Sequence, residues 1–229
     1  MFGYYEYGSL YWASIIAFVL CLIAEIRVKT TFSKYDKIKG KSGTTGAEVA
    51  KTLLRIGGIT NVKVECIHKN LGDHFDPTTK VIRLSEKVYD GSSVAALGVA
   101  AHEVGHALQY NEGYLPIRLR NGIYPVVAFG SNAAIPLFFL GLILSAANLM
   151  LTGIILFGCV AIFQFVTLPT EINASNRALE VLKTARILDE EEIGMASSVL
   201  KAAALTYVAA LVMTIVNLLR FIDMFRRRD

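Results

Sequence analysis

The 229-residue chain has too little polar surface for a soluble globular protein. Hydrophobic residues make up 54% of it and charged residues 18%, and this balance would leave a soluble fold without enough polar side chains to cover its outside. The net charge of +4 is clustered in short stretches, which argues against a nucleic-acid partner and fits a role in setting membrane topology. The composition therefore predicts an integral membrane protein whose main partner is the lipid bilayer.

The first apolar run covers residues 9–26, which is about the length needed to span a bilayer. Trp12 and several tyrosines lie at its start, as is typical of a membrane interface. Lysines and arginines follow it throughout residues 27–41. Residues 1–27 are therefore predicted to be a transmembrane anchor in the cell membrane, with the N-terminus outside and the following chain in the cytoplasm.

Residues 28–122 are predicted to form a cytoplasmic core, and the helix described next indicates that it is a metallopeptidase core. The segment Thr45–Glu48 has the pattern of a capping box that opens an amphipathic helix. Residues 62–66 alternate between apolar and polar side chains, which predicts a short strand, and residues 80–85 predict a second one after a turn-rich segment at 72–77. Together these strands predict a small hairpin or sheet before the next helix.

The next helix carries a His-Glu-x-x-His motif at His102, Glu103 and His106, inside an alanine-rich apolar stretch. Residues four apart share one face of a helix, so both imidazoles can bind the same metal ion. Zinc in a hydrolytic site takes three protein ligands and keeps one position for water, and the adjacent carboxylate can remove a proton from that water. This spacing predicts a zinc site for peptide-bond hydrolysis, with Glu103 as the base.

Two further histidines, His68 and His74, precede the motif and lack a partner at ligand spacing. If one of them closed the fourth zinc position, the site would be structural or regulatory and the protein would have no proteolytic activity. A metal transporter is a third reading, but it needs ionisable ligands at membrane depth, and the apolar runs contain almost none.

Residues 123–168 contain two apolar runs that predict a transmembrane helical hairpin. Pro125 and Pro136 lie in the first run, and membrane helices tolerate proline because neighbouring groups satisfy the freed backbone. The link between the runs carries no charge, whereas Arg118 and Arg120 precede them. Both ends of the hairpin are therefore expected on the cytoplasmic side.

Residues 169–200 are predicted to return to the cytoplasm as helices, the first beginning at Pro169 or Thr170. Glu171 is the best candidate for the third zinc ligand, ahead of Glu180 and Asp189. Spacing alone does not distinguish this interpretation from a simpler one, in which Glu171 only complements the helix dipole.

Residues 201–229 form an apolar helix followed by a basic tail. If this helix crosses the membrane, Arg220 and the arginines at 226–228 lie outside, against the positive-inside rule. Its length nevertheless favours a fourth membrane helix. The whole chain is thus predicted to be a mainly α integral membrane protein with three to four transmembrane helices.

Three motifs in this order resemble the bacterial family of membrane-bound neutral zinc metallopeptidases: residues 72–77 with 80–85, residues 101–109 and residues 171–178. The chain is more distantly similar to the heat-shock membrane protease and prenyl-protein endopeptidase group. The resemblance implies a zincin-like core of the glutamate-ligand (gluzincin) type, in which a small sheet packs on the motif helix. It also implies one Zn²⁺ per chain, with Glu103 as catalytic base and the ligands His102, His106 and Glu171.

The same resemblance implies roles around the metal. Related peptidases carry an aspartate four residues after the ligand glutamate, where it orients a ligand histidine; this chain has Ser175, which can accept an imidazole N–H but brings no charge. Arg177 matches the family pattern and is a candidate for stabilising the oxyanion, with an ion pair to a helix neighbour as the alternative. The substrate would lie along an edge strand formed by Val81, Ile82, Arg83, Leu84 and Ser85.

These observations predict a membrane-bound zinc endopeptidase. Peptide or membrane-protein segments are the expected substrates, because only a short stretch separates His106 from the apolar run that begins at Ile123.

Overall fold

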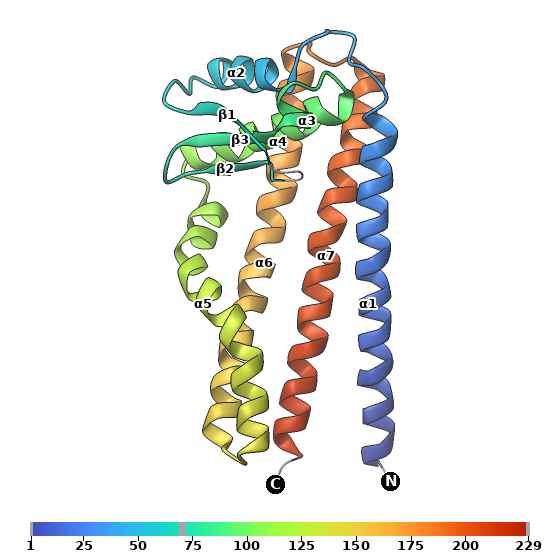
Figure 1. The fold of residues 1–229 in the computed structure, drawn as a ribbon, viewed down its shortest axis with the longest axis vertical. Helices are drawn as coiled ribbons and strands as arrows, with labels where there is room; N and C mark the ends of the chain where they lie inside the picture. The colour runs from blue at the N-terminus through green and yellow to red at the C-terminus, as the bar shows by residue number, and fades with distance from the viewer. Residues whose placement is uncertain (1, 69–71, 228–229) are drawn as a thin grey trace. The chain divides into compact units, whose positions relative to one another are not determined.

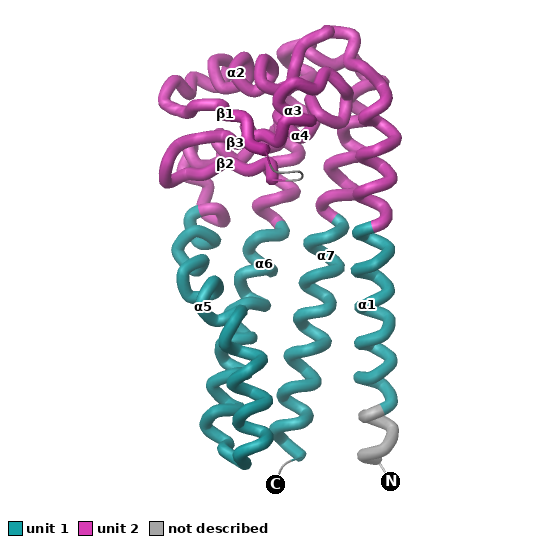
Figure 2. Tube along the Cα trace, in the orientation of Figure 1, with its two compact units in different colours: residues 1–25, 118–168, 205–229 teal, residues 26–117, 169–204 magenta. Residues whose placement is uncertain are grey.

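The computed structural model describes residues 2–68 and 72–227, with side chains from residue 8 onward. The chain is mainly α-helical with one small sheet (Figure 1). Its residues group into two compact units, shown in Figure 2. Unit 1 comprises residues 1–25, 118–168 and 205–229, and unit 2 comprises residues 26–117 and 169–204.

Unit 1 is built from parts of four long helices: α1 (Phe2–Tyr35), α5 (Leu115–Ile143), α6 (Ala147–Thr184) and α7 (Glu190–Arg226). All four are long and apolar enough to cross a membrane, so the chain is a multi-pass membrane protein and its C-terminal apolar helix is a fourth candidate span. Many of their large apolar side chains are exposed, as lipid-facing side chains must be, including those of Trp12, Phe129, Ile143 and Phe165.

Aromatic packing joins the helices of unit 1. The ring of Phe221 on α7 stacks on Phe138 of α5 with centroids 4.4 Å apart, and it meets Phe157 of α6 edge-on at 5.2 Å. Gly153 of α6 lies against α5 so closely that an added Cβ would be 2.7 Å from the carbonyl oxygen of Ala134. Small residues at such positions are typical of helix pairs in membranes.

Unit 2 contains a three-stranded sheet in the order β1-β3-β2, formed by β1 (Lys63–Ile67), β2 (His74–Asp76) and β3 (Val81–Ser85). Strand β3 pairs in parallel with β1 and antiparallel with β2. The prediction that residues 81–85 form an edge strand is therefore wrong, because β3 is the central strand and both of its sides are paired.

Strand β3 is central because β2 pairs with its second side. Strand β2 lies inside residues 72–77, which were predicted to be only a turn. The carboxylate of Asp76 accepts hydrogen bonds from the hydroxyl of Thr79 and from the backbone N–H groups of Thr78 and Thr79. It also pairs with Arg83 at 3.1 Å. The hydrogen bond from Thr79 contributes most to holding the pKa of Asp76 well below its usual range. These contacts close the tight β2-β3 turn, and the edges of the sheet are β1 and β2.

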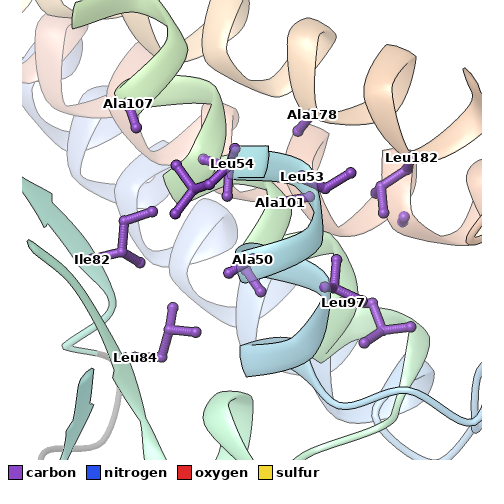
Figure 3. Packing of buried hydrophobic residues seen from close by; sticks show 14 of the residues in the cluster. Ala50, Leu53, Leu54, Ile82, Leu84, Leu97, Ala101, Ala107, Ala178 and Leu182 are labelled. Carbon is purple, nitrogen blue, oxygen red and sulfur yellow. The ribbon is translucent and has the colours of Figure 1, made fainter. Parts of the chain in front are cut away.

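The core of unit 2 lies between α2 (Gly46–Ile56), α4 (Val94–Asn111), α6 and the sheet. The predicted capping box is confirmed, since the Thr45 hydroxyl accepts from the Glu48 N–H and the Glu48 carboxylate accepts from the Thr45 N–H. Leu53 of α2, Leu97 of α4, Ile82 and Leu84 of β3 and Leu182 of α6 fill this core (Figure 3). The short helix α3 (Glu86–Tyr89) links β3 to α4, which begins after the capping residue Ser93.

Helix α6 continues through Pro169 without a break, so the prediction of a new helix start at residues 169–170 is wrong. A proline inside a helix removes only the hydrogen bond to the carbonyl four residues earlier, and membrane helices tolerate this loss. Glu171 therefore lies in the interior of a long helix. The simpler interpretation, in which its carboxylate complements a helix N-terminus, no longer applies because no N-terminus is there.

Helices α4 and α6 lie very close together at Gly105, between the two motif histidines. A Cβ added at Gly105 would lie 2.4 Å from the carbonyl oxygen of Ala174, which is backbone and cannot move aside alone. We expect Gly105→Ala to lower the free energy of unfolding by about 1–3 kcal/mol, as overpacking usually does. Thermal unfolding of the detergent-solubilised protein measures this loss.

The matched control is Gly194→Ala on α7 in the same unit, where an added Cβ meets nothing within 4 Å. Alanine is favoured over glycine inside a helix, so this variant should be neutral or gain about 0.5–1 kcal/mol. Equal melting temperatures for the two variants would contradict a close α4–α6 contact at Gly105.

Candidate metal centre

Two helices of unit 2 bring the candidate ligands together. His102 and His106 lie one turn apart on α4, and Glu171 lies on α6. Helical spacing places both imidazoles on the same face of α4, and this face is directed toward α6. Buried alanine and valine side chains of the same helix, Ala101, Val104 and Ala107, anchor that helix in the core.

The carboxylate oxygen Oε2 of Glu171 lies 3.2 Å from Nε2 of His102 and 3.4 Å from Nε2 of His106. One donor atom from each of the three residues lies within 4.8 Å of the other two, and in the described part of the chain they form a group that could hold one metal ion. His106 and Glu171 are buried, whereas His102 is half-buried.

The three donors fit zinc. Zinc binds imidazole nitrogen and carboxylate oxygen at about 2.0–2.2 Å in tetrahedral geometry, which puts neighbouring ligand atoms about 3.3–3.5 Å apart. The two measured distances from the Glu171 oxygen, 3.2 and 3.4 Å, are close to that separation. Two neutral imidazoles and one carboxylate leave one tetrahedral position for water or substrate.

Glu103 lies next to the first histidine and is buried. Burial is the main reason why the pKa of Glu103 is raised to about 7; the nearby carboxylates of Glu171 and Asp73 raise it further, while His102 and a hydrogen bond from the Phe75 backbone N–H lower it. A carboxylate with such a pKa can both accept and return a proton near neutral pH.

Each candidate histidine ligand has a polar partner at its other ring nitrogen. Oγ of Ser175 lies 3.1 Å from Nδ1 of His102, and Oε1 of Gln109 lies 3.0 Å from Nδ1 of His106. Such partners fix the orientation of metal-binding imidazoles. The partner Ser175 was expected from the sequence, whereas Gln109 was not. A polar residue three positions after His106 in an apolar helix nevertheless indicates a side chain that can contact the imidazole.

Arg177 forms its ion pair across two helices. Its Nη1 lies 2.7 Å from the Glu112 carboxylate at the end of α4, and its Nε donates to Asn173 Oδ1 at 2.8 Å. The structure thus gives Arg177 an ion pair, as the alternative expected, and its partner comes from the end of another helix. Its role at an oxyanion stays a prediction.

The remaining candidates lie elsewhere. His68 contacts Glu86, Nδ1 of His74 lies 2.6 Å from the Gly72 carbonyl oxygen, and both histidines are exposed. Neither belongs to the three-residue group. On β3, Ile82 and Leu84 point into the core.

The site combines two histidines one turn apart on a helix, a buried glutamate beside the first, and a second glutamate from another helix. This arrangement is a candidate for a His-Glu-x-x-His metal centre. In this chain the centre is part of a protein with four candidate membrane helices.

The chain belongs to the family whose description is "Putative neutral zinc metallopeptidase", and residues 10–226 match the model of that family. It is 47% identical over 212 residues to a protein of Bacillus subtilis (strain 168) named "Putative membrane protease YugP". That match covers 93% of this chain and 94% of the relative. No solved structure matches the chain.

Proposed function

We propose that this protein is a membrane-bound zinc endopeptidase with one Zn²⁺ per chain, held by His102, His106 and Glu171. The observation that carries the proposal is the convergence of these three donors from α4 and α6 beside the buried carboxylate of Glu103. Membership of a zinc metallopeptidase family supports the choice of metal and of reaction.

When bound, zinc supplies a Lewis acid that lowers the pKa of water and polarises a carbonyl group. The residues of the chain do the rest. Glu103 takes the proton from the attacking water and passes it to the amine that leaves from the cleaved peptide bond. Ser175 and Gln109 keep the imidazoles of His102 and His106 in place.

Strand β2 is the better candidate for holding an extended substrate, now that β3 is known to be the central strand. Among the described strands, β2 pairs only with β3, so its other edge has no strand partner there, and we propose that a substrate adds along it. The backbone N–H of Phe75 in this strand reaches the Glu103 carboxylate. A peptide that pairs with β2 would therefore lie next to the proposed base.

The orientation is proposed from charge. The basic residues within 27–41 lie in the C-terminal part of α1 and directly after it, which supports an N-terminus outside and a cytoplasmic metal centre in the cell membrane. The arginines at the end of α7 would then lie outside, and Arg227 has a compensating partner there, because its Nε pairs with Asp223 at 2.8 Å. Membrane proteins and their juxtamembrane segments are the substrates that we propose.

Chelation tests the requirement for metal. We expect 1,10-phenanthroline to abolish cleavage of casein by the purified protein in detergent, because the proposed mechanism needs the ion for both water activation and carbonyl polarisation. Dialysis followed by one equivalent of Zn²⁺ should restore cleavage. The non-chelating isomer 1,7-phenanthroline is the control and should leave the rate unchanged. Cleavage that survives complete removal of metal would rule out the proposed mechanism.

A further inference from the structure

Gln109 connects one candidate ligand to the helix that carries another. It lies on α4 and is completely buried. Its side-chain nitrogen Nε2 donates to the Thr170 carbonyl oxygen at 2.8 Å and to Asn173 Oδ1 at 2.9 Å, and both acceptors belong to α6. These two residues flank Glu171 closely in the sequence.

These contacts determine which way the amide of Gln109 faces. A backbone carbonyl oxygen only accepts hydrogen bonds, so the atom next to Thr170 has to be the amide nitrogen. The Asn173 atom that faces Gln109 is likewise identified as the oxygen Oδ1, since it also accepts a hydrogen bond from the Arg177 Nε–H at 2.8 Å. With both amide hydrogens directed at α6, the oxygen Oε1 faces His106.

The orientation of the amide in turn determines the tautomer of His106. An amide oxygen cannot donate, so Nδ1 of His106 has to carry the hydrogen in the 3.0 Å contact with Gln109. A neutral imidazole has one N–H, which leaves a lone pair on Nε2. Nε2 lies 3.4 Å from the Glu171 carboxylate oxygen, and in the neutral tautomer this arrangement is repulsive unless a metal cation lies between the two atoms; without a metal, a proton on Nε2 would take that place.

We propose that Gln109 is a positioning residue that holds His106 in the tautomer whose Nε2 can bind zinc together with Glu171. The inference rests on the proposed zinc site and adds to it the group that orients one ligand. The same amide connects the His106 ring to the α6 backbone on either side of Glu171. It therefore fixes the separation of two ligands that come from different helices.

The test compares two substitutions at one position. Gln109→Met keeps the length of the side chain but removes the acceptor, and the dissociation constant for Zn²⁺ should rise about 10–100-fold, as for other partners of ligand histidines. Gln109→Glu keeps an acceptor for His106 but loses both hydrogen bonds to α6, so it should bind zinc more weakly than the wild type. Zn²⁺ affinity is measured by competition with a chromophoric chelator in detergent. Leu97→Met, a buried change at the other end of α4, is the control for repacking.

A spectroscopic readout separates positioning from simple damage to the fold. The visible absorption of bound Co²⁺ reports the number and geometry of its ligands, and it should change in Gln109→Met but not in Leu97→Met. Melting temperatures of the metal-free variants show which of them are folded. If Gln109→Met does not fold, Asn173→Leu serves in its place, because it removes one of the two acceptors that hold the amide and should also weaken zinc binding.

Wild-type affinity and a wild-type Co²⁺ spectrum in folded Gln109→Met, or in Asn173→Leu where Gln109→Met does not fold, would overturn the inference. So would wild-type affinity in Gln109→Glu, because the two hydrogen bonds to α6 would then not matter. If the wild-type protein binds neither Zn²⁺ nor Co²⁺, the proposed function itself fails, and this outcome is distinct from the others.

Discussion

The Glu103→Gln variant is expected to lose peptide-bond cleavage while keeping its metal. Glutamine has nearly the same shape as glutamate, so the neighbouring ligand His102 should stay in place. Its amide cannot accept the proton of the attacking water, and general base catalysis contributes about 10²–10⁴-fold to such rates. We therefore expect casein cleavage to fall by at least about two orders of magnitude. Metal content per chain, measured by mass spectrometry of the purified protein, should equal that of the wild type.

The control for this variant is Glu190→Gln, which makes the same chemical change at an exposed residue that pairs with Lys183. It should cleave casein at the wild-type rate. Full activity in Glu103→Gln would mean that another group is the base. Loss of metal in Glu103→Gln would mean that the carboxylate supports the metal site directly.

The Glu171→Ala variant is expected to lose the metal itself. Alanine removes the only carboxylate among the three candidate ligands, and two imidazoles alone do not complete a hydrolytic zinc site. The loss of affinity should exceed the roughly 10–100-fold effect of removing a partner of a ligand. Metal content after purification and chelator competition both measure it, and one metal per chain is expected for the wild type.

Glu180→Ala provides a matched control on the same helix. Glu180 is exposed on α6 and is an alternative candidate for the third ligand on sequence grounds. Its replacement should leave metal content unchanged. If metal survives in Glu171→Ala and is lost in Glu180→Ala, the assignment of the third ligand is wrong.

Local patterns were sufficient for the elements that depend on local physics. The capping box at Thr45 follows from hydrogen bonds within three residues, and the structure has it. The apolar runs are similarly independent of context, because the length of a membrane helix is set by the bilayer. The mainly α membrane fold follows from these features alone.

The errors come from elements whose state depends on distant partners. Strand β2 is three residues long and has no pattern of its own; it exists because β3 pairs with it and Asp76 closes the turn. The propensity of proline for the first turn predicts a helix start at Pro169, but the helix is continuous on both sides of this residue. Local signals are overridden in both places by the surrounding structure.

Some residues of the candidate site can be predicted from local sequence patterns, whereas others depend on distant partners. The pair His102 and His106 can be read from helical spacing alone. Glu171 is far away in the sequence, and only the family resemblance raised it above the alternatives. The contact of Gln109 with His106 was open to prediction from spacing, but its two contacts with α6 depend on how the helices pack.

The order of the donors along the chain has a consequence for biosynthesis. The two histidines on α4 precede the apolar hairpin of residues 118–168, and Glu171 follows it. A nascent chain that has left the ribosome as far as α4 therefore carries two of the three donors and cannot assemble the centre. The third becomes available only after the hairpin has been synthesised and α6 has formed. Under the proposed function, the enzyme stays inactive during its own synthesis and matures together with membrane insertion.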